Sequence, residues 1–434
     1  MKIRNLIVVI VSAALLFACG QQQSSNEQEV EETEVGLAFA PNNDSLKLAD
    51  GFQAVVVTEG VNARTRHMVV RDNGDIYANI GSTDPDSSIV ALRDTNGDGV
   101  ADVVKFFDTY NGTGIAIDGD YLYASSITDV YRYKLDDDLV PQSMRETVVT
   151  GFINQRSHEA KCLTFDGVGN MYVSIGAPSN ACMQQARTMG SPGLDPCPQL
   201  ELQAGIWQFD KNQLNQVHGQ DGKRYATGMR NPMALDWNTA TNGLFAITHG
   251  RDQLSQLFPD YFTNEDNAEL PSEELFQIDD GDDFGWPYCY YDHVKGVKLL
   301  NPEYGGDGEI IGRCADKKDP IYGFPGHMAP NDMLFYTGDQ FPAKYKNGAF
   351  IAFHGSWNRA PLEQKGYFVV FVPFENGQIS GEYEVFADGF SRLDYVASPG
   401  DAKHRPMGLA QGPDGSIYIC DSVKGKIWRI VYTG

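Results

Sequence analysis

A short polar turn followed by an apolar strand recurs along this chain. Each copy has a turn rich in Asp, Gly and Asn, and then a run in which apolar and polar residues alternate. Alternation with a period of two is typical of a β-strand with one buried face, and the preceding residues are those of tight hairpin turns. Helical periodicity is confined to short pieces near 252–270. The pattern therefore predicts an all-β protein, with six copies at 71–81, 116–126, 165–176, 238–250, 344–355 and 412–422.

The spacing of the copies favours a six-bladed β-propeller. Their strand aromatics lie 46 residues apart from Tyr77 to Tyr123 and 105 residues apart from Phe245 to Phe350. The short interval suits one four-stranded blade per copy, and the long interval leaves room for inserted loops. An irregular β-sandwich is the alternative architecture.

Two apolar segments predict how the ring of blades closes. "FQAVVVTEG" at 52–60 and "KIWRIVYTG" at 426–434 read as strands of one shared blade, which would remove exposed sheet edges. The longest predicted insertions are 177–204 and 251–340. Inserted loops of a propeller gather at one mouth of the central channel, so we expect the functional site there.

The N-terminus predicts export and lipid attachment. A basic "MKIRN" precedes the apolar run "LIVVIVSAALLFA", and "LFACG" resembles a bacterial lipobox. We expect residues 1–18 to be a lipoprotein signal peptide and Cys19 to carry the lipid; a transmembrane anchor is the weaker alternative, because the run is short. Gly20 in place of an aspartate favours the periplasmic side of the outer membrane, with the lipid as the only membrane contact. Residues 19–44 read as a disordered acidic tether, and 45–434 as the propeller domain.

The charge balance of the protein narrows its partners. The 434-residue chain has a formal net charge of −24. Such a surface repels nucleic acid and anionic lipid, so neither is an expected partner. Basic residues that gather at one place in this acidic protein are therefore candidates for a specific anion site.

Six cysteines remain after Cys19, as expected of an exported protein with disulfides. Cys182 with Cys197, and Cys289 with Cys314, each close a local Gly/Pro-rich loop. Cys162 and Cys420 lie in strand-like segments. The sequence leaves two alternatives for them: two buried thiols or one long-range disulfide. The chain contains no CxxCH sequence for a c-type haem and no zinc-site spacing.

One acidic loop resembles the first part of a calcium-binding loop. "RDTNGDGVAD" at 93–102 places oxygen side chains at alternate positions with glycines at the turns. Lys105 stands where such loops have a bidentate glutamate. A structural calcium site and a solvated acidic hairpin both fit this loop, whose candidate ligands are Asp94, Asn96, Asp98 and Asp102.

Cationic and imidazole side chains recur beside strands in different predicted blades. Each lies just before or just after a strand that should border the channel, where catalytic groups tend to be presented. Arginine with asparagine suits a carboxylate or a quinone oxygen, and backbone carbonyls with an aspartate suit calcium. Together they predict a site for a planar polyanion; the residues are His158, Arg230, Asn231, Gly250, Arg251, Asp252, His354, Arg359 and Arg405.

Six motifs in order resemble the glucose/sorbosone dehydrogenases, quinoprotein sugar dehydrogenases that use pyrroloquinoline quinone (PQQ). The resemblance covers roughly residues 45–432 and is closest to the sorbosone and pyranose dehydrogenase branch. The motifs are "SHEAKCLTFDGVGNMYVSIGAPSN", "TGMRNPMALDW", "GDDFGWPYCYYD", "MLFYTGDQFP", "FIAFHGSWNR" and "RPMGLAQGPDGSIYICD".

The resemblance implies a role for each candidate residue. His158 would be the catalytic base, Arg230 and Asn231 would contact the quinone, and Arg405 would hold a cofactor carboxylate. The carbonyls of Gly250 and Arg251 fall where the family places a calcium that bridges to PQQ. The chain departs from the glucose enzymes at Met407, where they have a second arginine, and Arg359 is the candidate for the missing charge.

These observations predict a PQQ- and calcium-dependent oxidation of a sugar (an aldose, sorbosone or pyranose), with hydride transfer to the quinone. A neutral imidazole is a suitable base for the hydroxyl proton. Electrons would pass to a separate periplasmic acceptor, a cytochrome or a quinone, and the acidic surface suits a basic carrier. The alternatives are a calcium-dependent lactonase on the same fold and a tethered propeller without catalysis, which Met407 keeps open.

Overall fold

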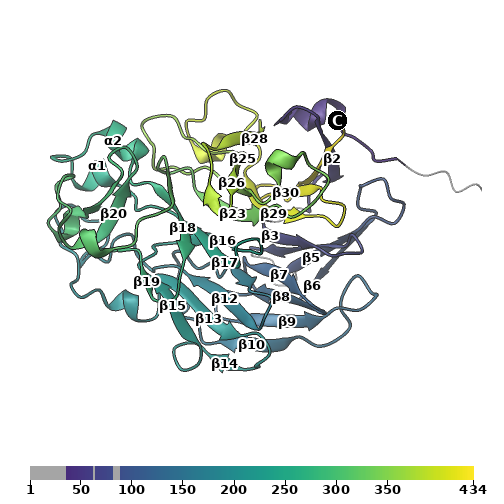
Figure 1. Ribbon diagram of the computed structural model, residues 1–434, viewed down its shortest axis with the longest axis horizontal. Helices are drawn as coiled ribbons and strands as arrows, with labels where there is room; N and C mark the ends of the chain where they lie inside the picture. The colour runs from purple at the N-terminus through teal and green to yellow at the C-terminus, as the bar shows by residue number, and fades with distance from the viewer. Residues whose placement is uncertain (1–35, 62–63, 82–87) are drawn as a thin grey trace, which may run out of the picture. The chain divides into compact units, whose positions relative to one another are not determined.

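Six β-sheets arranged around a central channel form the protein in a computed structural model that describes residues 36–61, 64–81 and 88–434 (Figure 1). Blade 1 is built from β3 (Thr65–Val70), β4 (Ile76–Ile80), β5 (Ile89–Arg93) and β6 (Val103–Phe107). Blade 2 is built from β7 (Ile115–Asp118), β8 (Tyr121–Ser125), β9 (Val130–Lys134) and β10 (Glu146–Thr150), with β14 (Gln216–Val217) added at its edge. Blade 3 is built from β11 (Leu163–Phe165), β12 (Asn170–Ile175), β13 (Gly205–Asp210) and β15 (Lys223–Thr227), with β19 (Asp282–Asp283) added.

The second half of the ring repeats this arrangement. Blade 4 is built from β16 (Pro232–Asn238), β17 (Gly243–Thr248), β18 (Glu273–Ile278) and β22 (Tyr322–Phe324). Blade 5 is built from β23 (Pro330–Phe335), β24 (Ala349–Phe353), β25 (Phe368–Val372) and β28 (Glu384–Asp388), with β1 (Lys47–Leu48) added. Blade 6 is built from β29 (Pro406–Gln411), β30 (Ile417–Asp421), β31 (Ile427–Tyr432) and β2 (Phe52–Thr58).

The first strands of the six blades form a closed ring. Each of β3, β7, β11, β16, β23 and β29 contacts the first strand of the next blade, and β29 returns to β3. The predicted six-bladed propeller is therefore confirmed. The predicted closure is confirmed as well, because β2 pairs antiparallel with β31 from Phe52 opposite Tyr432. A shared last blade ties both ends of the domain together and leaves no unpaired edge at the seam.

All six predicted turns are hairpins between the first and second strands of a blade. In blade 3 the Asp166 carboxylate accepts hydrogen bonds from the backbone N–H groups of Val168, Gly169 and Asn170, which fixes the turn between β11 and β12. This is the usual way in which an Asp side chain stabilises a tight turn. The repeated turn residues thus mark the same structural position in every blade.

Buried carboxylates join neighbouring inner strands. Asp236 of β16 accepts a hydrogen bond from the backbone N–H of Phe335 in β23, and Asp332 of β23 accepts one from Leu409 in β29, both at 2.8 Å. Burial raises the pKa of Asp236 to about 7 and that of Asp332 to about 8. These bonds lock blades 4, 5 and 6 in register.

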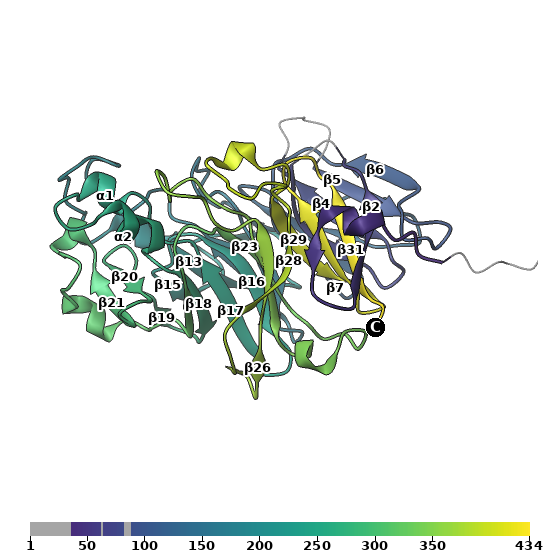
Figure 2. The ribbon, with the colours of Figure 1, turned by 90° about the horizontal axis from the view of Figure 1, so that it is seen from above.

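The predicted insertion at 251–340 is wrong in its extent, because that range contains three blade strands, β18, β22 and β23. Two separate insertions occur instead. Residues 249–272 carry the helices α1 (Leu254–Leu257) and α2 (Asn264–Glu269), and residues 279–321 carry the hairpin of β20 (Cys289–Asp292) with β21 (Val297–Leu300). Both lie together at one side of the propeller in Figures 1 and 2.

Short elements complete the described chain. They are the 3-10 turns η1 (Pro41–Ser45), η2 (Pro198–Glu201), η3 (Pro302–Tyr304), η4 (Gly312–Asp316), η5 (Ala343–Tyr345) and η6 (Pro399–Asp401), and the hairpin of β26 (Phe374–Glu375) with β27 (Gln378–Ile379). The described helices are all too short to cross a membrane.

The globular unit begins earlier than predicted. It extends from Gly36 to Gly434, so residues 36–44 belong to the propeller rather than to the tether. Asp44 forms ion pairs with Arg392 and Lys426 and accepts a hydrogen bond from Trp428 Nε1. The predicted signal peptide, Cys19 and the rest of the tether lie outside the described residues.

Candidate active site

A cavity of about 320 Å³ opens at one mouth of the channel, where the inner strands begin. Five blades line it. Blade 3 supplies His158 in the loop before β11, blade 4 supplies Asn231 and His249 at its first two strands, and blade 6 supplies Arg405 just before β29. The polar lining also includes Arg66, Arg156, Glu159, Asn331 and His354. The structure therefore brings together four residues that the sequence nominated: His158, Asn231, His354 and Arg405.

His158 is held as a neutral imidazole with one nitrogen free. Its Nδ1 lies 2.6 Å from the carbonyl oxygen of Ala177, so Nδ1 carries the proton and donates it. No described residue hydrogen-bonds to Nε2, and the ring lines the cavity. Burial, followed by the positive charge of Arg230, lowers the pKa of His158 to about 3. The lone pair on Nε2 is thus available to accept a proton.

The backbone at His158 is strained and is held in place by neighbouring side-chain amides. Its φ of 53° is unusual for a residue other than glycine, and such strain tends to occur at functional sites. The Gln155 side-chain amide donates to the carbonyl oxygens of Ser157, His158 and Gly176 at 2.8–3.0 Å. The Gln203 side chain donates to Gln155 in turn, at 2.5 Å. This chain of amides places the imidazole.

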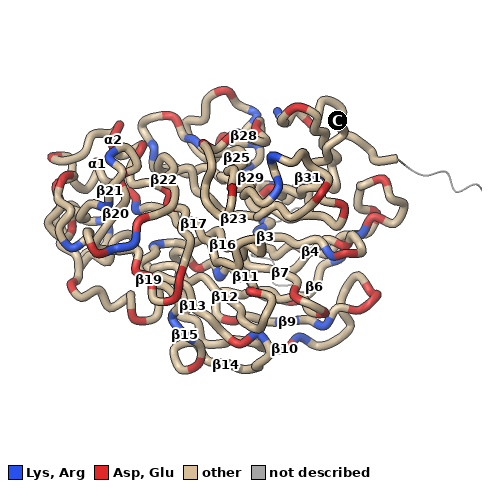
Figure 3. The backbone as a smooth tube through the Cα atoms, viewed as in Figure 1, with Lys and Arg blue, Asp and Glu red and all other residues tan. Residues whose placement is uncertain are grey.

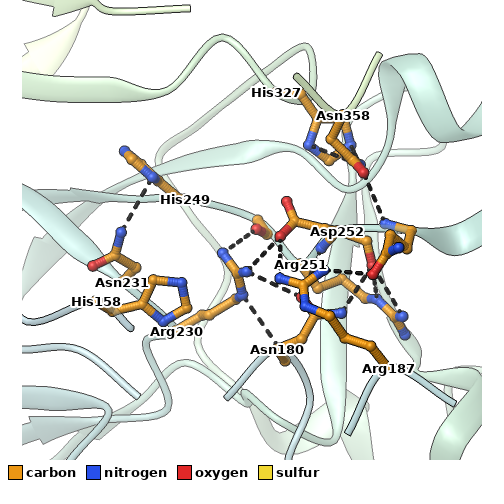
Figure 4. Close-up of polar contacts among 12 residues, drawn as sticks. His158, Asn180, Arg187, Arg230, Asn231, His249, Arg251, Asp252, His327 and Asn358 are labelled. Atoms are coloured by element: carbon orange, nitrogen blue, oxygen red, sulfur yellow. Dashed lines mark hydrogen bonds and ion pairs between the residues drawn. The ribbon is translucent and has the colours of Figure 1, made fainter. Parts of the chain in front are cut away.

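Arg230 lies beside His158 and is fully engaged with the protein (Figure 4). Its guanidinium donates to both oxygens of Asn180, to the carbonyl of Gly250 and to the carboxylate of Asp252. Arg187 also pairs with Asp252, at 2.8 Å. Burial favours the neutral acid, but the two arginines hold the pKa of Asp252 well below its usual range. Arg230 therefore acts on His158 through its charge.

The floor of the cavity contains amide groups with spare hydrogen-bonding capacity. His249 Nε2 donates to the Pro330 carbonyl at 3.0 Å, and its Nδ1 accepts from Asn231 Nδ2 at 3.2 Å. Burial lowers the pKa of His249 to about 4, so this arrangement is stable at neutral pH. The side-chain oxygen of Asn331 is buried and has no partner among the described residues. An orphaned acceptor at a cavity floor calls for a ligand donor or a water.

Cations that line this cavity lack a carboxylate partner. Most arginines of the described chain form an ion pair with Asp or Glu. Arg66, Arg156 and Arg405 do not, and all three line the cavity. Arg405 donates only to the backbone carbonyls of His354 and Gly355. In a protein of net charge −24, three guanidinium groups without a carboxylate partner thus line one cavity, which suits a multiply charged anion.

Two other nominated residues have different surroundings. The buried ring of His354 lines the cavity, and its Nε2 lies 2.7 Å from Ser422 Oγ. Burial, followed by Arg405, lowers its pKa well below the ordinary value. Arg359 is not at the cavity: its guanidinium pairs with Glu269 and donates to the carbonyls of Ala268, Gly326 and Glu363. It fastens α2 to the neighbouring loops, whereas Arg66 and Arg156, which the sequence did not nominate, line the cavity.

The residues nominated for a calcium beside the cofactor are engaged in other contacts. The Gly250 carbonyl and the Asp252 carboxylate both accept hydrogen bonds from Arg230. The nominated ligand of Arg251 is its backbone carbonyl, and its side chain is buried against Glu303 at 2.5 Å. Guanidinium groups stand where a cation would bind these oxygens. In the protein by itself this set does not fit calcium.

The acidic loop of blade 1 is closed by its own backbone. Asp94 accepts hydrogen bonds from the N–H groups of Asn96, Gly97 and Gly99, and Asp102 accepts from the N–H and hydroxyl of Thr95. Asp98 accepts from the N–H of Val100. Residues 36–61, 64–81 and 88–434 contain no group of three or more His, Cys, Asp or Glu side chains placed to hold a metal. Calcium binding at this loop stays a prediction.

The cysteines follow the sequence prediction for the two local pairs. Cys182–Cys197 and Cys289–Cys314 are disulfides, with Cα–Cα distances of 6.2 and 5.8 Å. Cys162 and Cys420 are buried free thiols, which decides between the two alternatives. The thiol of Cys162 donates to the Met233 carbonyl.

Several residues of the site were missed at the level of sequence. Arg66 stands at the start of an inner strand, so the rule that selected Arg405 would have found it in "ARTRHMVV". His249 lies in "THGRDQL", next to the glycine that was selected. Gln203 and Asn180 carry no local signal, because their partners Gln155, Arg230 and Asp252 are 48 to 72 residues away. Gln155 bonds to nearby carbonyls, but no sequence pattern marks it.

The class of this protein is thus a six-bladed propeller with a neutral imidazole and arginines without carboxylate partners at one mouth of its channel. The chain belongs to the TrAA12-like family, whose sequence model matches residues 46–433. It is 25% identical over 418 residues to the pyrroloquinoline quinone-dependent sugar dehydrogenase of Hypocrea jecorina, with 88% of each chain covered. It is also 25% identical over 378 residues to the pyrroloquinoline quinone-dependent pyranose dehydrogenase of Coprinopsis cinerea; the match takes in 78% of this chain but spans about half, 48%, of that relative.

The fold of a solved structure agrees with this assignment. The calcium structure of the Trichoderma reesei Carbohydrate-Active Enzymes Family AA12 protein superimposes with a TM-score of 0.72 at 20% identity. The superposition covers 92% of this chain and 99% of that one. At this identity the likeness concerns the fold.

Proposed function

We propose that this protein oxidises a sugar with PQQ as the electron acceptor and His158 as the base. The observation that carries the proposal is the free, unprotonated Nε2 of His158 in a cavity lined by the uncompensated guanidinium groups of Arg66, Arg156 and Arg405. PQQ is a planar molecule with three carboxylates, so these cations match its chemistry. The PQQ dependence of the relatives supports the same conclusion.

Oxidation of a sugar hydroxyl removes a proton from oxygen while hydride leaves the adjoining carbon. His158 would accept that proton at Nε2, while its Nδ1–H stays bonded to the Ala177 carbonyl and keeps the ring in place. Arg230 opposes protonation of the ring, so the imidazolium readily releases the proton to water. When bound, PQQ would supply the hydride acceptor.

Asn231, Arg156 and Arg405 would hold the cofactor, and Arg66 lies where this cavity meets a second one. Met407, which stands where the glucose enzymes have an arginine, is buried, and its sulfur lies 3.0 Å from Asn331 Nδ2. Arg156 can replace that charge, because it reaches the same cavity from another blade.

We propose further that calcium binds at Gly250 and Asp252 only together with the cofactor. Both oxygens accept hydrogen bonds from Arg230, so a cation needs that arginine to be drawn toward an anion first. Equilibrium dialysis with radioactive calcium should show uptake at this site only when PQQ is present. This coupling would be contradicted if the protein took up as much calcium without PQQ as with it. That uptake would have to persist in Asp94→Asn and be lost in Asp252→Asn, which assigns it to this site.

We propose that the mature protein is anchored by a lipid on Cys19 to the periplasmic side of the outer membrane. There it would pass electrons to a separate cytochrome or quinone. Figure 3 shows acidic residues along the outer turns of the blades, and this charge favours a basic carrier. Cell fractionation of a Cys19→Ser variant should find the protein released from the membrane, and retention there would contradict the anchor.

The test of the main proposal is a reconstitution of the chain without residues 1–19. PQQ binding is followed by absorbance, and dye reduction is measured with a panel of aldoses. His158→Gln should keep PQQ binding and lower kcat by roughly 10²–10⁴, the range for loss of a general base. The matched control is His293→Gln, because His293 is a histidine of the 279–321 insertion. This variant should stay active.

The alternatives predict other outcomes. Absence of PQQ binding would leave a propeller without redox catalysis, and hydrolysis of a sugar lactone without PQQ would indicate a lactonase. If His158→Gln oxidised sugars with an undiminished kcat, the role of His158 as the base would be overturned, but the PQQ-dependent oxidation would stand.

A further inference from the structure

A second cavity of about 240 Å³ lies beside the first, between blades 1, 2 and 3. The two cavities share Arg66, Glu159 and Ala160. They therefore meet at Arg66 and at the two residues that directly follow His158 in the sequence. Arg64 and Arg66 line the second cavity from the start of β3. Its other polar groups come from the loops at 111–113, before β7, and 126–127, after β8.

The two arginines of this second cavity have no carboxylate within 4.0 Å among the described residues. Arg66 makes one side-chain hydrogen bond, from Nε to Thr113 Oγ1 at 3.3 Å, so its terminal nitrogens stay available. Burial, the largest effect, lowers the pKa of Arg66 although Cys162 and Glu159 oppose the shift. A buried guanidinium without a counter-ion is unfavourable by itself, and an anionic ligand would compensate it.

The backbone keeps space for these side chains. A Cβ atom on Gly81 would lie 3.2 Å from Cδ of Arg66, so glycine lets the Arg66 side chain lie across the strand end. Glu159 is exposed at the junction of the two cavities and forms no ion pair in the described structure. Its carboxylate is placed to accept hydrogen bonds from sugar hydroxyls.

We propose that the second cavity binds the carboxylate of an acidic sugar through Arg64 and Arg66, while the hydroxyl to be oxidised lies at His158. The planar forks of arginine match a carboxylate, and the adjoining cavities match a ligand with an anionic group at one end and a reactive hydroxyl at the other. This inference names the substrate class of the proposed dehydrogenase and therefore rests on that function.

Binding to the PQQ-free mature chain is measured first, by calorimetry with glucuronate, galacturonate, glucose, galactose and a sulfated sugar. The uronates should bind about tenfold or more tightly than their neutral counterparts, as expected for a charge-assisted contact. Raising the salt concentration should weaken uronate binding alone. Tighter binding of the sulfated sugar than of either uronate would overturn the carboxylate assignment, and equal binding of uronates and neutral sugars would overturn the subsite.

Arg64→Gln should abolish the preference, lowering the uronate-to-neutral ratio of kcat/KM about tenfold or more in the PQQ-loaded enzyme. The matched control is Arg224→Gln, since Arg224 also lacks a carboxylate partner in the described chain but donates to the Leu200 carbonyl away from the mouth. A ratio that falls equally in both variants would overturn the role of Arg64.

The two proposals fail differently. Uronate binding that Arg64→Gln removes, in a protein that oxidises no sugar, would leave the subsite standing and overturn the dehydrogenase. Oxidation of neutral sugars with no preference for uronates would leave the dehydrogenase standing and overturn the subsite.

Discussion

At the scale of single residues, the site depends on the close approach of two loops at His158. Gly176 directly follows β12 and lies against His158: a Cβ there would be 2.5 Å from the His158 Cβ and 2.6 Å from its carbonyl oxygen. The next residue, Ala177, accepts the Nδ1 proton and donates its own N–H to the Arg230 carbonyl. A glycine is therefore needed at 176 for the space it leaves, since its φ lies outside the left-handed region.

Gly176→Ala should displace the imidazole without unfolding the blade. We expect at least about tenfold loss of kcat, because a misplacement of about 1 Å at a catalytic group costs up to about 10²-fold. The measurement is kcat for dye reduction beside the melting temperature. Gly400→Ala is the matched control, because a Cβ there meets only the Ser398 hydroxyl at 3.9 Å. An unchanged kcat in Gly176→Ala would show that the loop adjusts freely.

At the scale of elements, the insertions carry part of the site and are fixed covalently. The loop between β12 and β13 contains Asn180, which accepts two hydrogen bonds from Arg230 and one from the backbone N–H of Asp252. The Cys182–Cys197 disulfide closes this loop over 15 residues, and Cys289–Cys314 closes its neighbour over 25. The segment from Cys182 to Cys197 contains no named strand or helix, so its disulfide holds it in place.

Replacement of Cys182 and Cys197 together by Ala should lower the free energy of unfolding by about 3 kcal/mol, the loop-entropy value for 15 residues. It should also weaken PQQ binding, because Asn180 loses its fixed position against Arg230. Urea unfolding and a PQQ titration measure the two effects. Cys162→Ala is a control without a disulfide, and equal PQQ affinity in the double variant would contradict the link between the disulfide and the site.

At the scale of the whole molecule, several histidines are buried as neutral rings and should make the protein sensitive to acid. Burial lowers the pKa of His158, His218, His249, His327 and His354. A group whose pKa is lower in the folded state stabilises the fold above its unfolded pKa. That contribution is lost as the pH falls below the unfolded value of about 6.5 toward the folded one.

His218 allows a test outside the site. Its ring packs on Trp207 and Phe152, both nitrogens lack a partner in the described structure, and burial followed by Lys161 lowers its pKa to about 4. Between pH 8 and pH 5 this residue should cost about 2 kcal/mol of stability. In His218→Phe that loss should disappear, measured as the difference in urea-unfolding free energy at the two pH values. Phe152→Leu changes the same packing without removing a titratable group and should be no less sensitive to acid than the wild type.

The sequence by itself determined the fold of this protein. The period-two alternation and the six Asp/Gly/Asn turns depend on contacts between residues that are neighbours in the sequence. The complementary end strands follow from the pattern that is repeated in every blade. The disulfide pairs were predictable for the same reason, because each closes a short loop. His158, Asn231, His354 and Arg405 were found because they stand at the ends of strands that the repeat had located.

Tertiary structure decided which charged residues are free to bind. Arg359, Arg230 and Arg66 look alike in the sequence, but Arg359 and Arg230 are paired with the carboxylates of Glu269 and Asp252, whereas Arg66 has no such partner in the described structure. The extent of the 251–340 insertion was misjudged because β18, β22 and β23 are separated by the loops of the insertions. Contacts such as that of Arg359 with Glu269, 90 residues apart, leave no periodic trace in the chain. Local periodicity fixes a propeller, but only the closed ring shows which cations lack a counter-ion.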